Sequence, residues 1–366
     1  MRVAIDISAT TLNAAGTSTY INELISAFKP FEPDVELLPV SYPYHFDRVH
    51  KFLRKIDTLH RETIWTSHAL PSIVKNMNAE ALHSPAALAP CKSSLPVIVT
   101  IHDLYTFRSP HSFTLWQKYS FNYWLPKVIA AAQRIIAISN FTKNEILSFF
   151  PKTAEGKIAV IYEGANKRYA KIGREKIDAF KIKYNLHKPF LLSVSTIEPR
   201  KNLPNILSAF SLIKDKIGHD LVLVGQYGWK SKQIYNLIHE KKINDRVKFL
   251  GFIPIEELPS AYNSADLFIY IPSYEGFGLP PLEAMACGCP VIVSDVASLP
   301  EVVGDAAIKV DPQDVEQLAQ TIKSVLMDNA ALKKFSIQGI ARSKVFSWER
   351  CAKQTLEVYK DTIQGR

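Results

Sequence analysis

Short apolar runs rich in Val and Ile alternate with helix-like stretches along nearly the whole chain. Most of these runs are apolar at every position, which is typical of parallel strands that are covered by helices on both faces. The pattern predicts three strands in the first half and five in the second: Val3–Ser8, Val97–Asp103, Arg134–Ser139, Phe190–Ser195, Asp220–Gly225, Val247–Phe252, Leu267–Pro272 and Val291–Asp295.

A polar, irregular stretch near Glu163–Lys171 separates the two halves, and the same alternation occurs on both sides of it. The length of 366 residues also suits two domains. We therefore predict an α/β fold with two Rossmann-like, doubly wound domains, residues 1–168 and 169–347, that face each other across a cleft. Ligands of such sheets bind at the carboxyl ends of the strands, so we expect the ligand in that cleft.

Composition and the N-terminal sequence indicate a cytoplasmic protein. Hydrophobic residues make up 47% of the chain, and no apolar run reaches the length of a transmembrane helix. The opening "MRVAIDIS" resembles a strand and not a signal peptide. The cysteines lack the spacing of a zinc site and are interpreted as reduced thiols in the core: Cys91, Cys287, Cys289 and Cys351.

The net charge of +9 is compatible with nucleic acid, an anionic membrane surface or anionic small substrates as partners. A nucleic-acid binder needs a concentrated basic stripe with interleaved aromatic residues, and only Arg48–Arg61 approaches one. This run is alternatively a solvated helix face. We therefore expect no nucleic-acid partner.

The loop after the predicted strand Leu267–Pro272 has the features of a phosphate-binding turn. Gly276 and Gly278 allow a ligand to approach the main chain closely. Pro280 and Pro281 suit the first turn of a helix, where their missing N–H groups would be unsatisfied in any case. The start of a helix attracts anions, and the two prolines leave most of the donors to the glycine loop.

Two glutamates flank this loop, Glu275 within it and Glu283 eight positions later. We place Glu283 in the first turn of the helix, where its carboxylate can accept hydrogen bonds from ribose hydroxyls. Glu275 can do the same for the hydroxyls of a sugar. The alternative is that Glu283 only complements the helix dipole and that Glu275 is solvated.

A second strand-to-helix turn lies in Ser195–Phe210, "STIEPRKNLPNILSAF". Asn202 is expected to cap the helix, with Pro204 in its first turn. Arg200 and Lys201 then stand just before a helix N-terminus, which suits an anion. Alternatively, they are two solvated basic residues.

Two turns of the first half carry weaker signals. His102 and Asp103 follow the strand that begins at Val97, and they are either functional or a helix cap with a satisfied histidine. Gly16 precedes a helical run after the first strand, but the full G-x-G-x-x-G pattern of a dinucleotide site is missing.

Together these motifs resemble the GT-B retaining glycosyltransferases of family 4, the glycosyltransferase group 1 family, over nearly the whole chain. The most specific match is the E-x7-E motif, Glu275 to Glu283, followed by "TIEPRKNL" (Thr196–Leu203) and "GFIPIEELPSAYNSADLFIYIPS" (Gly251–Ser273). Phe346–Lys360 resembles the terminal helix of the family, which implies that residues from about 348 to 366 pack back on the first domain.

The resemblance implies transfer of a hexose from a nucleotide-sugar, such as UDP-glucose or GDP-mannose, to a glycan or lipid-linked acceptor in cell-envelope polysaccharide synthesis, with retention of configuration. Glu283 would bind the ribose, Glu275 would lie by the donor sugar, and Lys201 would bind the diphosphate. His102 would lie where the acceptor attacks the sugar, so the implied catalytic residues are His102, Lys201 and Glu275. The remaining donor contacts would come from Gly16, Phe252, Ile253, Gly276, Phe277, Gly278 and Leu279.

One departure from the family concerns the diphosphate. Many relatives have Gly-Arg where this chain has Ser195-Thr196, and that arginine normally joins the lysine. Thr196 lies in the donor site without this charge, and Arg200 is the candidate replacement. No D-x-D occurs in the chain, so we expect neither a metal nor a cofactor, and Lys201 with helix N-termini would offset the diphosphate charge.

Three other functions compete with this interpretation. A glycoside hydrolase would use Glu275 and Glu283 as its carboxylate pair and would need no nucleotide, but it leaves the Arg200-Lys201 turn unexplained. A nucleic-acid or polyanion binder lacks the basic stripe. A nucleotide-sugar epimerase or a phosphorylase on the same architecture is the nearest rival.

The acceptor side is suggested by Tyr105–Trp124, in which eight residues are aromatic. Aromatic rings suit sugar faces and also membrane interfaces. With the basic run Arg48–Arg61, they predict peripheral contact with the anionic inner face of the cell membrane. The alternative is that most of these aromatic residues form the core of a helical hairpin.

Overall fold

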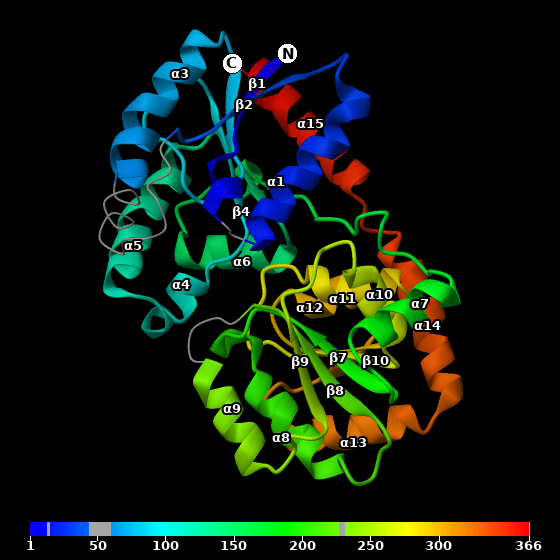
Figure 1. The fold of residues 1–366 in the computed structure, drawn as a ribbon. Coiled ribbons are helices and arrows are strands. Elements are labelled where there is room, and N and C mark those ends of the chain that lie inside the picture. The colour runs from blue at the N-terminus through cyan, green and yellow to red at the C-terminus, as the bar shows by residue number, and fades with distance from the viewer. Residues whose placement is uncertain (13–14, 44–59, 227–230, 366) are drawn as a thin grey trace. The chain divides into compact units, whose positions relative to one another are not determined.

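The computed structural model describes residues 1–12, 15–43, 60–226 and 231–365, and the chain divides into two compact units (Figure 1). The first unit consists of Met1–Glu163 together with Trp348–Arg366, and the second is Gly164–Ser347. The first part of this unit therefore ends at Glu163, whereas the boundary predicted from the sequence lies after residue 168. Most of the basic run Arg48–Arg61, residues 48–59, lies outside the described residues.

The first unit contains a six-stranded sheet in the order β2-β1-β3-β4-β5-β6, with all neighbouring strands parallel. Its strands are β1 (Arg2–Asp6), β2 (Glu36–Val40), β3 (Ala81–Ser84), β4 (Val97–Ile101), β5 (Arg134–Ala137) and β6 (Ile158–Val160). Its helices are α1 (Ala15–Phe28), α3 (Leu70–Asn76), α4 (Tyr105–Arg108), α5 (Leu115–Ala131), α6 (Asn140–Phe149) and α15 (Trp348–Gln364), with a π-helical segment at Arg61–Ala69.

Helices cover both faces of this sheet. Side chains of α3, α5 and α6 pack on one face, and α1 and α15 lie together on the other. The terminal helix α15 is tied to the sheet by Tyr359, whose hydroxyl lies 2.7 Å from Nδ1 of the fully buried His83 on β3. The last helix of the chain is thus an integral part of the first unit.

The second unit contains a second six-stranded parallel sheet, in the order β12-β11-β10-β7-β8-β9. Its strands are β7 (Phe190–Val194), β8 (Asp220–Val224), β9 (Val247–Gly251), β10 (Leu267–Tyr270), β11 (Val291–Ser294) and β12 (Ile308–Val310). Its helices are α7 (Arg174–Lys183), α8 (Leu203–Ile213), α9 (Ser231–Glu240), α10 (Leu258–Ser264), α11 (Leu279–Ala286), α12 (Leu299–Val303), α13 (Val315–Leu326) and α14 (Asn329–Ser343).

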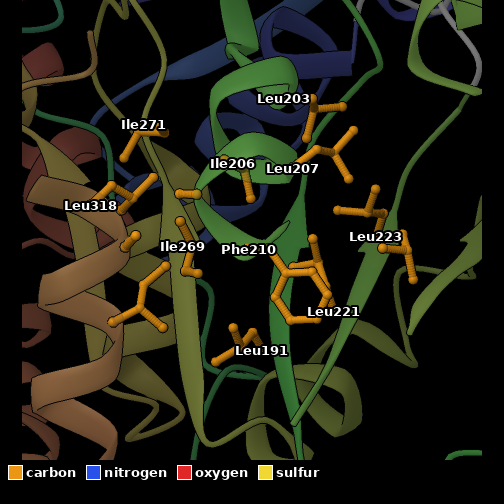
Figure 2. Close-up of a cluster of buried hydrophobic side chains, with 14 of the residues drawn as sticks. Leu191, Leu203, Ile206, Leu207, Phe210, Leu221, Leu223, Ile269, Ile271 and Leu318 are labelled. Atoms are coloured by element: carbon orange, nitrogen blue, oxygen red, sulfur yellow. The ribbon is translucent and has the colours of Figure 1, made fainter. Parts of the chain in front are cut away.

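A hydrophobic cluster fixes β7, β8 and β10 against α8 and α13 (Figure 2). On α8, the apolar residues recur at helical spacing, so that Leu203, Leu207 and Phe210 all reach the sheet and are at most 3% exposed. Each such side chain contributes roughly 1.5–3 kcal/mol when it is buried. The packing holds the carboxyl ends of β7 and β10, where the polar turns begin, in a fixed register.

All eight predicted strands are present, and the predicted class of two doubly wound α/β domains is confirmed. Strands β2, β3, β6 and β12 were not predicted from the sequence. None of the helices in the described residues is long and apolar enough to cross a membrane.

Candidate functional site

The order of the strands in the second unit reverses between β7 and β10. From β7 the chain adds β8 and β9 on one side, and then β10, β11 and β12 on the other. Ligands of open α/β sheets bind outside the strand ends at such a reversal. The turn that follows β7 carries Arg200 and Lys201, and the loop that follows β10 carries Glu275. Both sequence motifs therefore end at the same edge of the sheet.

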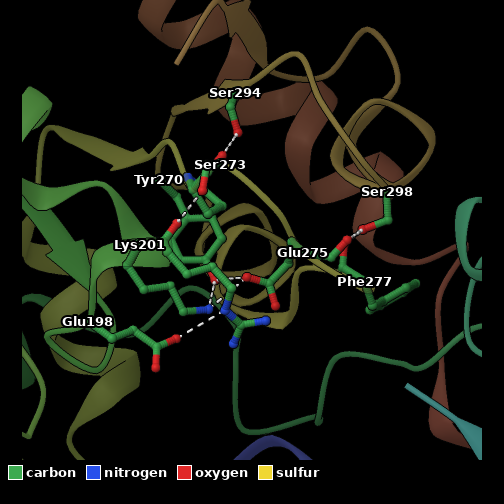
Figure 3. A network of polar contacts seen from close by, with 10 residues as sticks. Glu198, Lys201, Tyr270, Ser273, Glu275, Phe277, Ser294 and Ser298 are labelled. Atoms are coloured by element: carbon green, nitrogen blue, oxygen red, sulfur yellow. Dashed lines mark hydrogen bonds and ion pairs between the residues drawn. The ribbon is translucent and has the colours of Figure 1, made fainter. Parts of the chain in front are cut away.

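Lys201, Glu275 and Tyr270 form a closed triangle of hydrogen bonds at this edge (Figure 3). Lys201 Nζ donates to Glu275 Oε2 at 2.7 Å and to the Tyr270 hydroxyl at 2.8 Å. The same hydroxyl donates to Glu275 Oε2 at 2.7 Å. The lysine and glutamate side chains are only 10% and 15% exposed, so both are ordered and largely shielded from water.

Arg200 supplies a second cation beside the triangle. Its Nε donates to Glu198 Oε1 at 3.1 Å, and its main-chain oxygen accepts from the Ser273 N–H at 2.9 Å. Burial disfavours the ionised form of Glu275, but Lys201, Arg200 and the Tyr270 hydroxyl outweigh it and lower the pKa of this carboxyl to about 2. Glu275 is thus a carboxylate at neutral pH, and the alternative that these charges are simply solvated is wrong.

The glycine loop is held through its carbonyl groups. The hydroxyl of the fully buried Ser298 lies 2.9 Å from the main-chain oxygen of Glu275 and 2.8 Å from that of Phe277, and its single hydrogen is shared between them. Gly278 has a φ of +117°, which a residue with a side chain rarely adopts. The Phe277 ring is 2% exposed and packs edge-on against Phe346, so this residue can meet a ligand only through its main chain.

Glu283 lies in the second turn of α11 and not in the first, because the helix already begins at Leu279. The Tyr262 hydroxyl of α10 donates to Glu283 Oε2 at 2.9 Å. Burial and the Glu283 carboxylate raise the pKa of Tyr169, which lies in the same cluster. The carboxylate is therefore oriented by neighbouring tyrosines and does more than complement the helix dipole.

Asn202 does not cap α8 with its side chain. It occupies the N-cap position in the left-handed conformation, with a φ of 56°, but its amide donates to the Pro312 oxygen at 2.7 Å. Asn205 donates to the same oxygen. The turn is thereby tied to the segment after β12, which fixes where Lys201 emerges.

The remaining predicted donor residues of this unit differ in exposure. Thr196 is exposed at the end of β7, next to Ser195. Gly225 is required there, because a Cβ on it would lie 2.0 Å from the Ser195 oxygen. Beyond β9, Phe252 is 67% exposed and Ile253 only 3%. Phe252 is thus available to a flat ligand, whereas Ile253 belongs to the core.

Gly16 and His102 lie in the first unit. Gly16 is the second residue of α1, inside the helix and not before it, and a Cβ there would meet nothing within 4 Å in the described part of the chain. Asp103 accepts from the Tyr105 N–H at 3.0 Å, and both ring nitrogens of His102 have partners. The alternative is therefore right that His102 is a satisfied histidine, but Asp103 is not the cap of α4, because Leu104 occupies the N-cap position.

Several residues around these sites were not identified from the sequence, Tyr169 among them. Tyr270 and Tyr262 stand in apolar segments as members of the core, and Glu163 and Ser298 lie in irregular stretches. The sequence contained one signal that could have identified Tyr270, namely a tyrosine hydroxyl at the carboxyl end of a predicted strand. The described residues contain no group of three or more His, Cys, Asp or Glu side chains placed to hold a metal ion.

Two family models match the chain, "Glycosyltransferase Family 4" over residues 15–168 and "Glycosyl transferases group 1" over residues 175–342. O-antigen chain mannosyltransferase B of Escherichia coli is 34% identical over 268 residues, which cover 72% of this chain and 70% of that protein. The chain belongs to the family 4, group 1 glycosyltransferases. The serotype-specific mannosyltransferase WbdA of Escherichia coli is 30% identical over 240 residues, 64% of this chain, which spans only 29% of WbdA.

Solved structures share the fold of this glycosyltransferase. Sucrose-phosphate synthase from Thermosynechococcus elongatus superimposes with a TM-score of 0.81 at 20% identity, over 100% of both chains. HepE from Anabaena, in complex with UDP and glucose, gives a TM-score of 0.78 at 18% identity, over 99% of this chain and 100% of its own. These likenesses confirm the GT-B architecture that the sequence predicts.

Proposed function

We propose that this glycosyltransferase moves a hexose from a nucleotide-sugar to a glycan or lipid-linked acceptor in polysaccharide synthesis. The observation that carries the proposal is the Lys201–Glu275–Tyr270 triangle with Arg200 beside it, at the point where the strand order reverses. A diphosphate needs ordered cations, and a sugar needs ordered hydrogen-bond acceptors. This edge of the sheet supplies both kinds of group.

In the proposed complex, Lys201 and Arg200 bind the diphosphate. Each is already held by a carboxylate, Glu275 or Glu198, so little side-chain freedom remains to be lost when the donor binds. Arg200 takes the place of the arginine that is absent at Thr196. Glu283 binds the ribose hydroxyls, and its hydrogen bond from Tyr262 fixes the plane of the carboxylate for this purpose.

Glu275 is poorly suited to be the covalent nucleophile of a retaining mechanism, because its Oε2 already accepts hydrogen bonds from Lys201 and Tyr270. We propose attack on the face from which the diphosphate leaves. The bond from the anomeric carbon to the phosphate oxygen breaks, the bond to the acceptor oxygen forms, and the acceptor proton passes to the departing phosphate. Lys201 and Arg200 stabilise the negative charge that develops on this phosphate, without a metal.

Mannose is the hexose that the comparisons favour, since the relative with 34% identity is named a mannosyltransferase of the O-antigen chain. We accordingly propose GDP-mannose as the first donor to test and UDP-glucose as the second. The same relative supports a role in building a cell-surface polysaccharide. The four cysteines carry free thiols, which fits work in the reducing cytoplasm.

The acceptor side is proposed to contact an anionic membrane through α5. Five large apolar residues of this helix are exposed: Leu115, Trp116, Tyr119, Phe121 and Tyr123. Lys127 Nζ lies 3.3 Å from the centre of the Tyr123 ring. The segment itself has no acidic residue between Asp103 and Glu145, and the Glu62 carboxylate that accepts from Ser120 of α5 is only 15% exposed. This combination suits the interface of an anionic bilayer.

The alternative of a buried aromatic hairpin holds for only part of the segment. Phe107 packs against the core of the first unit, with its ring 5.6 Å from that of Phe149. Trp116 is 50% exposed and Tyr119 71%, which is unusual for core residues.

A panel of nucleotide-sugars read by calorimetry tests the proposed function. We expect one donor to bind with the affinity of its free nucleoside diphosphate or better, and Lys201→Ala to abolish most of the heat. Absence of binding for GDP-mannose, UDP-glucose and their nucleoside diphosphates would contradict the proposal.

A further inference from the structure

The His102 ring is held on three sides within the first unit. Its Nε2 lies 2.9 Å from the Pro85 main-chain oxygen, after β3, and its Nδ1 lies 3.4 Å from Glu163 Oε1, after β6. The Tyr20 ring of α1 meets it edge-on, with 4.9 Å between the ring centres. The His102 side chain is nevertheless 19% exposed, so one edge of the ring still reaches solvent.

The two partners determine the protons on this ring. A carbonyl oxygen can only accept, so Nε2 must carry a hydrogen. A neutral imidazole then has a lone pair on Nδ1, which cannot bond to an ionised carboxylate. The Nδ1–Glu163 contact is therefore made either by an imidazolium and a carboxylate or by a neutral ring and a protonated Glu163.

The first of these two states is favoured. Burial disfavours the charged ring, but the hydrogen bond and charge of Glu163 and the Pro85 carbonyl outweigh it and raise the pKa of His102. The Glu163 side chain is 5% exposed, so its charge is poorly screened by water. Asp103, next in the chain, acts in the same direction.

The other titratable groups around the ring are uncharged near neutral pH. His83 is buried with its nitrogens bonded to the hydroxyls of Tyr359 and Thr100, and burial lowers the pKa of His83 to about 3. Burial raises the pKa of Tyr20 and that of the Cys351 thiol on α15, near Glu163. Of the two carboxylates that act on His102, Glu163 therefore has the larger effect and Asp103 the smaller.

We propose that Glu163 is a positioning residue for transfer, which keeps His102 protonated and fixed in one orientation. The inference rests on the proposed function and on the role beside the transferred sugar that the family resemblance implies for His102. A protonated ring with both N–H groups engaged is no general base. The imidazolium neutralises the Glu163 carboxylate, so loss of the His102 proton at rising pH leaves an unpaired negative charge that repels the anionic donor, and transfer must decline.

Glu163→Gln tests the pair, because the amide has nearly the same shape, carries no charge and can donate to Nδ1 of a neutral ring. The titration of His102 is followed by NMR of histidine-labelled protein, and its signal is assigned by its loss in His102→Gln. We expect a midpoint above 6.5 in the unaltered protein and a fall of at least about one pH unit in Glu163→Gln. An equal midpoint in both proteins would overturn the proposal.

Two further variants complete the NMR test. Glu155→Gln removes a carboxylate of the same unit that is 71% exposed and bonded to Lys143, and it should leave the midpoint unchanged. Glu163→Asp retains the charge and should return the midpoint toward that of the unaltered protein. A fall in midpoint as large for Glu163→Asp as for Glu163→Gln would show that shape and not charge matters, against the proposal.

The pH profile of kcat/KM tests whether the His102–Glu163 pair affects transfer. We expect transfer to decline as the pH rises through the His102 midpoint, and this decline to move to lower pH in Glu163→Gln by the shift seen in NMR. A profile that does not move, although the midpoint does, would remove Glu163 from transfer. Failure of every nucleotide-sugar to react would instead refute the proposed function, and the NMR result would still decide the His102–Glu163 pair.

Discussion

Lys201 Nζ lies 2.7 Å from Glu275 Oε2, although the two residues are separated by 74 positions in the chain. They meet because β7 and β10 are neighbours in the sheet, so that the turns after them leave from the same edge. A cation and a hydrogen-bond acceptor are thereby held side by side, as the proposed binding of a sugar joined to a diphosphate would require.

Removal of the Lys201 amine should weaken donor binding more than removal of any other cation in the second unit. Lys201→Ala loses charged hydrogen bonds to the diphosphate, each worth roughly 1.5–3 kcal/mol, or about 10- to 150-fold in affinity. Arg200→Ala should weaken binding less, because Arg200 is held at the edge of the cluster by Glu198. Calorimetry with the nucleoside diphosphate measures both variants.

Lys309→Ala is the matched control, because this lysine is in the same unit and, among the described residues, bonds to the Gly304 oxygen and to the exposed Asp305. Equal losses for Lys201→Ala and Lys309→Ala would indicate a general effect of charge and would contradict a specific diphosphate site.

Glu283→Ala should weaken binding of the nucleotide by at most roughly 3–5 kcal/mol, since two hydrogen bonds from ribose hydroxyls to a charged acceptor are lost. Tyr262→Phe leaves the carboxylate in place but releases its orientation, so it should cause a smaller loss in the same direction. Glu316→Ala, on α13, is the control. Unchanged affinity of Glu283→Ala for both UDP and GDP would remove Glu283 from the ribose site.

The stability of the first unit should fall as the pH drops below about 6.5. Burial lowers the pKa of His83 to about 3, so between pH 6.5 and 3 the unfolded chain binds one more proton than the folded one at this position. The free energy of unfolding should therefore decline by about 1.4 kcal/mol for each pH unit over this window.

In a Trp229→Phe background, tryptophan fluorescence during denaturant unfolding follows this unit, because the other four tryptophans, Trp65, Trp116, Trp124 and Trp348, all lie in it. In His83→Gln, the dependence of the free energy of unfolding on pH should be weaker by the contribution of one proton. His111→Gln, which alters an exposed histidine of the same unit, should leave the slope of this dependence unchanged. Identical slopes for His83→Gln and the unaltered protein would show that His83 is not the group responsible.

Contact with an anionic membrane should depend on the exposed face of α5. Trp116→Ser with Tyr119→Ser removes aromatic surface, and Lys118→Glu costs roughly 1 kcal/mol of attraction for each unit of charge changed. Co-sedimentation with anionic and with zwitterionic vesicles measures the effect. Ile337→Ser on α14, where the side chain is 59% exposed, is the control. Protein that stays in the supernatant with both vesicle types would refute the membrane contact.

The parts of the fold that the sequence predicts are those with local signals. Strands such as β7 and β8 are continuous apolar runs, and the turn after β7 has its cations and proline in order. By contrast, β3 has four residues and includes the buried His83, whose place in the sheet depends on a hydroxyl from α15. β12 has three residues, and one of them is the exposed Lys309.

In the candidate site, too, the residues with local sequence signals were predicted and those that depend on tertiary contacts were not. The resemblance identifies Lys201 and Glu275, but it does not reveal Tyr270, which bonds to both of them from the end of an apolar strand. Glu163 pairs with His102 only because β4, β5 and β6 are consecutive in the sheet. Partners brought together by sheet order leave no periodic pattern in the sequence, so these residues required the structure.

The most direct test of the account is NMR of the complete reaction in EDTA, with GDP-mannose or UDP-glucose and a glycan acceptor. We expect one nucleoside diphosphate for each new glycosidic bond, and an anomeric proton signal with the configuration of the donor. An inverted anomeric centre, free sugar without transfer, conversion of the donor without an acceptor, or activity that returns only with Mn²⁺ or Mg²⁺ would contradict it.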